Sequence, residues 1–224
     1  MINMFTRFSK KDRSQRSQYF DTVYAENMFH GDESISGQGS SEKATRVVRK
    51  EITQIIKKYE IKTILDLPCG DLNWMRLLLE ANKNILYTGA DVSTEIIKKN
   101  LIKYPGLKFF CFDAVAEKID RSYDSIFCRD LLVHLPNAEI LECIDNFKKS
   151  GSRWLLTTTF TRREKNPDLV YSKSIVEWRP INLEVEPFNL KNYEYLFMEE
   201  CEEGDGEYSD KAIALYDLNT LNIV

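Results

Sequence analysis

Metal-binding and disulfide-forming side chains are scarce in this chain of 224 residues. It has only two histidines, His30 and His134, and five cysteines that are widely spaced and form no Cys-x-x-Cys pair. Structural zinc sites and disulfide frameworks need these residues in clusters or in even numbers. We therefore expect neither a metal site nor a disulfide framework, and we interpret the cysteines as reduced, mostly buried side chains.

Long hydrophobic runs and a surplus of positive charge are also lacking. No apolar run approaches the roughly 18 to 20 residues that cross a bilayer, and residues 1–20 have no apolar core of a secretory signal. A cytoplasmic location without a membrane span is therefore expected. The net charge of -4 argues against a nucleic-acid partner, because neutralising phosphates needs clustered Lys and Arg. The hydrophobic share of 43% fits one globular domain.

Four apolar segments each have an acidic residue at or next to their C-terminal end. The first runs into a tight turn, Pro68-Cys69-Gly70, and residues 74–79 then have the pattern of a helix start. A fifth apolar segment, residues 154–160, has no terminal acid. The four segments are residues 64–67 with Asp66, 85–92 with Asp91, 108–113 with Asp113, and 123–130 with Asp130.

A helical pattern at residues 44–59 precedes these segments, and further helical patterns at residues 94–102 and 136–150 follow the second and the fourth of them. Strands that alternate with helices indicate right-handed crossovers and a parallel sheet, which binds ligands at the carboxyl ends of its strands. Two last apolar runs, residues 193–198 and 212–216, predict an antiparallel pair. The predicted fold is α/β: a doubly wound, mostly parallel seven-stranded sheet with an antiparallel C-terminal strand.

The ordered motifs resemble those of class I S-adenosylmethionine-dependent methyltransferases, from about Ser40 to the C-terminus. Three flanking stretches, residues 31–41, 157–162 and 178–183, resemble a bacterial subgroup of uncertain acceptor. One departure is that Pro68 and Leu72 replace two glycines of the usual first motif. The motifs are Ile64-Leu65-Asp66-Leu67-Pro68-Cys69-Gly70, Gly89-Ala90-Asp91-Val92, Phe112-Asp113-Ala114, and Phe127-Cys128-Arg129-Asp130 with His134-Leu135-Pro136.

The resemblance implies a Rossmann-like methyltransferase fold in two parts. Residues 1–40 would be an N-terminal extension and a loop that covers the cofactor. Residues 41–224 would be the methyltransferase domain, with a substrate loop at about 161–190, where the helical period fails.

The resemblance also implies S-adenosylmethionine as cofactor and assigns residues to its parts. Asp66 would lie near the methionine amine and Asp91 would accept hydrogen bonds from the ribose hydroxyls, with a helix cap as the alternative role of each. Asp113 would meet the adenine, with an ordinary turn at the strand end as its alternative role. Arg129 would bind the cofactor carboxylate or a substrate anion, or only pair with Asp130. The further expected cofactor-binding residues are Gly39, Ser40, Pro68, Cys69, Gly70, Val92 and Ala114.

Asp130 and His134 are the candidate catalytic residues. Asp130 would orient or deprotonate the acceptor, and His134, four residues later, would take a proton during the attack. A structural, hydrogen-bonded role for His134 is the alternative. A methyl transfer of this kind needs no metal.

The expected substrate-binding residues are Arg162, Arg163, Trp178 and Arg179. Guanidinium forks suit phosphate and carboxylate, so a small anionic acceptor such as a phosphorylated or nucleotide-linked sugar is the sharper hypothesis. The alternative is that these side chains only close the loop over the core.

Two other functions compete with a methyltransferase. A nicotinamide-dependent oxidoreductase would share the acid at Asp91, but it needs a Gly-x-Gly-x-x-Gly turn that residues 68–72 do not supply. A non-catalytic cofactor-binding protein of the same fold is the third reading.

Overall fold

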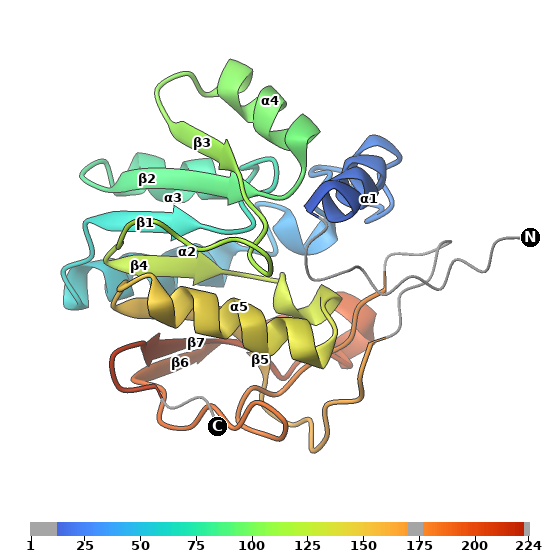
Figure 1. Ribbon diagram of the computed structural model, residues 1–224, viewed down its shortest axis with the longest axis vertical. Helices are drawn as coiled ribbons and strands as arrows, with labels where there is room; N and C mark the ends of the chain where they lie inside the picture. Colours follow the sequence, from blue (N-terminus) through green and yellow to red (C-terminus); the bar gives the residue numbers. More distant parts are fainter. Residues whose placement is uncertain (1–12, 170–176, 222–224) are drawn as a thin grey trace, which may run out of the picture.

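The computed structural model describes residues 13–169 and 177–221 (Figure 1). The first 12 residues of the predicted extension and residues 170–176 of the predicted substrate loop therefore lie outside the described residues, as do residues 222–224.

The described chain contains one sheet in the order β3-β2-β1-β4-β5-β7-β6. β7 is antiparallel to both of its neighbours, and the other pairings are parallel. The predicted fold is confirmed, including the antiparallel strand near the C-terminus. The strands are β1 (Thr63–Asp66), β2 (Leu86–Asp91), β3 (Lys108–Cys111), β4 (Ser125–Cys128), β5 (Trp154–Phe160), β6 (Tyr195–Met198) and β7 (Lys211–Asp217).

Helices cover both faces of the sheet, with α5 (Asn137–Lys149) on one face and α2 (Arg46–Lys58), α3 (Met75–Ala81) and α4 (Thr94–Lys103) on the other (Figure 1). Successive strand residues point to opposite faces. Ile64 accordingly packs in the core with α2, and Leu65 packs in the core with α5. This arrangement explains why the strands have continuous apolar runs and not alternating ones.

A further helix, α1 (Arg13–Ala25), lies at the edge of the sheet toward which the arrowheads of β1, β2 and β4 point (Figure 1). Asp21 ties α1 to the start of α4, since its carboxylate accepts from the Ser93 hydroxyl at 2.5 Å and from the Glu95 N–H at 3.1 Å. Ser93 itself caps α4, as its side chain accepts from the N–H of Ile96. The N-terminal helix is thus fixed beside the carboxyl ends of the strands.

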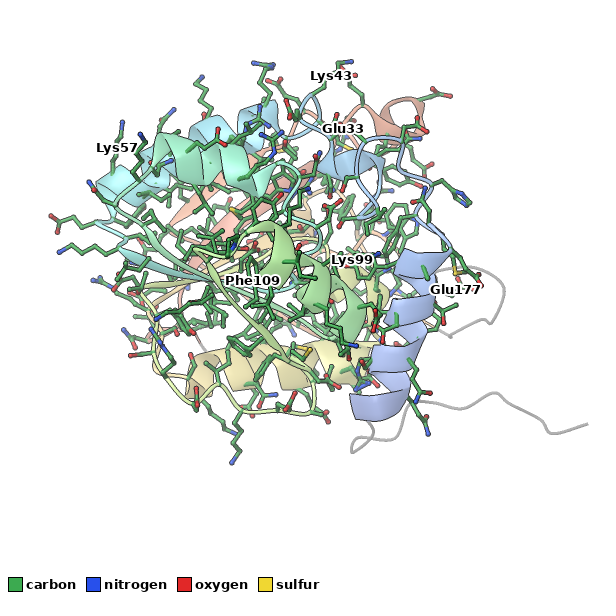
Figure 2. All side chains as sticks on the ribbon, turned by 90° about the horizontal axis from the view of Figure 1, so that it is seen from above. Glu33, Lys43, Lys57, Lys99, Phe109 and Glu177 are labelled. Carbon is green, nitrogen blue, oxygen red and sulfur yellow. The ribbon has the colours of Figure 1, made fainter. Side chains whose placement is uncertain are left out.

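The remaining regular elements are three short 3₁₀ turns, η1 (Gln38–Ser40), η2 (Leu132–His134) and η3 (Glu203–Gly206). Seen from above, the labelled side chains show the usual partition: Lys43 and Lys57 extend into solvent and Phe109 of β3 lies inside (Figure 2). The described parts of residues 161–194 contain no helix or strand, as expected for a loop. Among the described helices, none is both long and apolar enough to span a membrane.

Candidate active site

A pocket of about 360 Å³ lies at the carboxyl ends of β1, β2 and β4, between these strand ends, α1 and the loop around η1. Its volume is within the range of small-molecule sites. All but three of the residues expected to form the site line this pocket, and the exceptions are Arg162, Arg163 and Arg179.

Asp66 ends β1 at one side of the pocket and is 3% exposed. Its carboxylate accepts a hydrogen bond of 2.6 Å from the Tyr87 hydroxyl. Burial raises the pKa of Asp66 to about 8, because the charged form loses its hydration. A positively charged group beside this carboxylate would restore its ionised form.

The turn after β1 brings the main chain close to Asp91. Gly70 has φ = 51°, and a Cβ atom there would lie 2.3 Å from the Ser36 Oγ atom, so the turn needs glycine at this position. The Gly70 N–H donates to the Asp91 Oδ2 atom at 3.2 Å. Leu72, which replaces a glycine of the usual motif, adopts φ = 59°.

Asp91 ends β2 and is 1% exposed. Besides the Gly70 N–H, its carboxylate accepts from the Ser93 N–H at 2.9 Å and from the Tyr24 hydroxyl at 3.3 Å. Burial raises its pKa to about 6, although these hydrogen bonds oppose the change. Asp91 therefore both shapes the turn and offers a carboxylate to the pocket.

Asp113 follows β3 and is held by the N-terminal helix. Its carboxylate accepts from the Arg16 Nε atom at 3.1 Å and from the Val115 N–H at 3.0 Å, and both Arg16 and Asp113 are almost fully buried. An acid from the third strand thus meets a cation from the first helix.

Asp130 follows β4 in a left-handed backbone conformation, φ = 59°, which is uncommon for a residue other than glycine. Its carboxylate accepts from the Lys211 Nζ atom at 2.7 Å and from the Thr158 hydroxyl at 3.1 Å. Burial raises the pKa of Asp130, but the charges of Lys211 and Arg129 outweigh it and lower the pKa below its ordinary value. Asp130 is therefore a carboxylate that stays ionised and a weak base.

His134 lies at the end of η2, with its ring 5.5 Å from that of Phe29. Burial lowers its pKa, so the ring is neutral at pH 7. Its Nδ1 atom lies 2.9 Å from the carbonyl oxygen of Glu177, and because a carbonyl only accepts, Nδ1 carries the proton. Nε2 is then the unprotonated nitrogen of a ring that lines the pocket.

The fold is shared with solved methyltransferase structures. The N-methyltransferase NodS from Bradyrhizobium japonicum WM9, in complex with S-adenosyl-L-homocysteine, aligns with a TM-score of 0.61 at 11% identity over 88% of this chain and 98% of its own. Magnesium protoporphyrin IX methyltransferase (ChlM) from Synechocystis PCC 6803 aligns with a TM-score of 0.60 at 13% identity, over 91% and 98%.

A third structure, an S-adenosylmethionine-dependent methyltransferase from Clostridium acetobutylicum ATCC 824, aligns with a TM-score of 0.55 at 13% identity, over 79% of this chain and 92% of its own. No protein of curated function matches the sequence significantly. Residues 65–150 match the family model described as a methyltransferase domain. This range contains the first motif turn, Asp91, Asp113, Asp130 and His134.

The fold is that of class I S-adenosylmethionine-dependent methyltransferases, and residues 65–150 match a methyltransferase domain. The antiparallel strand β7 and the match to a methyltransferase domain favour a methyltransferase over a nicotinamide-dependent oxidoreductase.

The pocket fits S-adenosylmethionine on the chemistry of its own groups. Asp66 is a buried carboxylate with no cation within ion-pair distance among the described residues, and the methionine ammonium is a cation. Asp91 presents acceptor oxygens of the kind that bind a ribose diol. These two residues, with the main chain at Gly70, would hold the methionine and ribose parts.

The pocket is also lined by residues that belong to none of the sequence motifs. Arg16, Phe20 and Tyr24 of α1 line the pocket at intervals of four residues, so they share one face of the helix. That spacing is a signal visible in the sequence. Lys211 and Tyr208 also line the pocket, but only the antiparallel course of β7 brings them there.

The three arginines outside the pocket all bind other groups of the protein. Arg163 pairs with Asp210 at 3.0 Å. The Arg162 Nη2 atom donates to the Ser209 hydroxyl at 2.5 Å. Arg179 donates to the carbonyl of Pro167 at 2.8 Å and to Asn137.

Trp178, in contrast, lines the pocket and is 41% exposed. Its ring lies 4.9 Å from that of Tyr208 and 6.4 Å from that of Phe160. These three residues, Phe160, Trp178 and Tyr208, form what we call the aromatic wall.

Proposed function

We propose that this methyltransferase transfers a methyl group from S-adenosylmethionine to a hydroxyl or amine of a small acceptor whose ring packs on the aromatic wall, with His134 as the base. The observation that carries the proposal is the neutral His134 ring, which lines the same pocket as the aromatic wall and has its Nδ1 proton directed to Glu177.

The sulfonium of the cofactor supplies an already activated methyl group. The protein's main contribution is then to hold the acceptor in line with it. His134 Nε2 takes the proton of the attacking hydroxyl or amine. The acceptor's new bond to the methyl carbon replaces the carbon–sulfur bond, whose electron pair stays on sulfur, and the imidazolium returns its proton to water.

Asp130 has a different role in this proposal. Because Lys211 and Arg129 lower its pKa, it accepts a hydrogen bond from the acceptor and orients it, but does not remove the proton. The two candidate catalytic residues thereby divide orientation and proton removal between them.

The charge of the acceptor follows from the same contacts. The aromatic wall suits the apolar face of a sugar or an aromatic ring. An anionic group has weaker support, because Arg162, Arg163 and Arg179 do not line the pocket and Lys211 and Arg129 are already paired with carboxylates. We therefore favour a neutral ring over the phosphorylated or nucleotide-linked sugar of the sequence hypothesis.

The test is release of S-adenosylhomocysteine from S-adenosylmethionine with matched acceptors. The pairs are catechol with 3,4-dihydroxybenzoate and glucose with glucose 1-phosphate, and aniline represents amines. We expect the neutral member of a pair to react faster, and Trp178→Ala to lose this activity while Arg162→Ala keeps it. Faster reaction of the anionic members would contradict the neutral acceptor. If S-adenosylhomocysteine is released no faster with the protein than without it for every compound, the proposed acceptor class is wrong.

A further inference from the structure

Four charged side chains form ion pairs with one another at the edge of the sheet where the parallel strands end. Arg129 and Asp130 follow β4, Glu199 directly follows β6, and Lys211 opens β7. Because β7 is antiparallel, its first residue meets the last residues of the parallel strands. Arg129, Glu199 and Lys211 are each less than 9% exposed, so their charges are balanced by one another and not by water.

Glu199 holds the Arg129 guanidinium in a two-pronged contact. Arg129 donates from Nε to the Oε1 atom at 3.2 Å and from Nη2 to the Oε2 atom at 2.7 Å. Such a fork fixes the plane of the guanidinium as well as its position. Glu199 does not line the pocket, whereas Arg129 does.

The same Nη2 atom of Arg129 donates to the carbonyl oxygen of Gly39 at 3.1 Å. Gly39 lies in η1, 90 residues earlier in the chain, and lines the pocket. From the other side, the Asn73 amide donates to the carbonyl of Ser40 at 3.0 Å, so the η1 loop is also attached to the turn that follows Asp66. The loop around Gly39 therefore lies over the end of the pocket that Asp66 forms.

We propose that Glu199 is a positioning residue for cofactor binding: it orients Arg129, which holds the Gly39 carbonyl and thereby keeps the η1 loop closed over the methionine part of S-adenosylmethionine. This inference deepens the proposed function and rests on it, since it requires the methionine part to lie beside Asp66. It gives Arg129 a contact with the loop in place of direct contact with the cofactor carboxylate.

The orientation of the Arg129 guanidinium depends on Glu199 because Asp130 offers the guanidinium a second carboxylate. The Arg129 Nη1 atom is already 3.3 Å from the Asp130 Oδ2 atom. Without Glu199, the guanidinium has one remaining carboxylate partner in this group and turns toward it, which breaks the contact of Nη2 with Gly39.

The experiment compares two ligands that differ in the methionine part. S-adenosylhomocysteine has the amino acid, and 5′-methylthioadenosine lacks it but retains the adenosine and the sulfur. By isothermal titration, Glu199→Gln should weaken binding of S-adenosylhomocysteine about tenfold and leave binding of 5′-methylthioadenosine within about twofold. Glu200→Gln is the matched control, because Glu200 is the next residue, is exposed and pairs with Arg46 on the surface. It should change neither affinity.

A double-mutant cycle tests whether Glu199 acts through Arg129. In the Arg129→Met background, Glu199→Gln should cause no further loss of affinity for S-adenosylhomocysteine. Glu199→Asp keeps the charge but shortens the side chain, and it replaces Glu199→Gln if that variant does not fold.

Two outcomes separate this inference from the proposed function. If the wild type binds both ligands but Glu199→Gln weakens both equally, or weakens neither, the positioning role of Glu199 is wrong and the cofactor site stands. If the wild type does not bind S-adenosylhomocysteine, the proposed function is wrong and the inference with it.

Discussion

At the scale of single residues, the site consists of carboxylates whose surroundings give them opposite properties. Burial raises the pKa of Asp66 to about 8, whereas Lys211 and Arg129 overcome burial at Asp130 and lower its pKa. The difference is the presence of a cation within hydrogen-bond distance. Asp66 therefore suits a cationic ligand, and Asp130 suits a hydrogen-bond donor.

Asp66 makes the stability of the protein depend on pH. Its pKa in the unfolded chain is about 3.9, so the folded state holds a proton that the unfolded state has lost between pH 4 and 8. This contribution to stability is complete below pH 4 and is lost as the pH rises toward 8. Relative to wild type, Asp66→Asn should gain on the order of 5 kcal/mol in the free energy of unfolding between pH 4 and pH 8, because the pKa of Asp66 is about 8 in the folded state and about 3.9 in the unfolded chain.

Urea unfolding at the two pH values measures this gain. Asp145→Asn, which changes a half-exposed carboxylate that pairs with Lys149 on α5, is the control for removal of a carboxylate. If the free energy of unfolding of Asp66→Asn differs from that of wild type by the same amount at both pH values, the pKa of Asp66 is not raised in the folded state.

As the proposed base, His134 would set the lower pH limit of activity. A base must be unprotonated, and burial lowers its pKa below the ordinary value of about 6.5. With the fastest acceptor of the panel above, kcat/KM should therefore rise with pH to a plateau that is reached by pH 7. His134→Gln should lack this rise and lose roughly a hundred- to ten-thousand-fold in kcat/KM. The same rise in His134→Gln would assign the base to another group.

At the scale of elements, α1 forms part of the wall of the pocket that we propose binds the cofactor. Arg16 contacts Asp113 and Tyr24 contacts Asp91, so one helix face touches two of the acids that end strands. Phe20 lies between them on the same face. The helix thus contributes both charge and apolar surface to the pocket.

Substitutions on the two faces of α1 should therefore differ. Arg16→Met leaves Asp113 without its guanidinium partner and should weaken binding of S-adenosylhomocysteine by about tenfold in isothermal titration. Gln18→Ala, on the exposed face of α1, should bind as the wild type does. Equal affinities for Arg16→Met and wild type would remove α1 from the site.

At the scale of the whole molecule, the repeated pattern of apolar run and terminal acid was enough to predict the sheet, and all but three of the predicted site residues line the pocket. The pattern uses residues that are close in sequence, and the parallel sheet then brings the strand ends together. The ion pairs of Arg16 with Asp113 and of Glu199 with Arg129 could not be predicted, because the partners lie 97 and 70 residues apart.

The arginines of the substrate loop show a second limit of the sequence. A guanidinium that binds an anionic ligand and one that fixes a loop look the same in a sequence. Arg179 donates to the carbonyls of Pro167 and Val133, and Arg163 pairs with Asp210 and stacks on Phe160. These partners depend on how the loop folds over β5 and β7, which local pattern does not encode.

The most direct test of the account is isothermal titration of the wild type and Asp91→Ala with S-adenosylhomocysteine. Asp91 is the acid expected to accept hydrogen bonds from the ribose, and two hydrogen bonds to a charged group are worth about a hundredfold in affinity. With Asp145→Asn as the control for removal of a carboxylate, we predict binding by the wild type and the control, and a loss of about a hundredfold in Asp91→Ala. No binding by the wild type, or equal affinity in Asp91→Ala, would contradict the assignment of this pocket to S-adenosylmethionine.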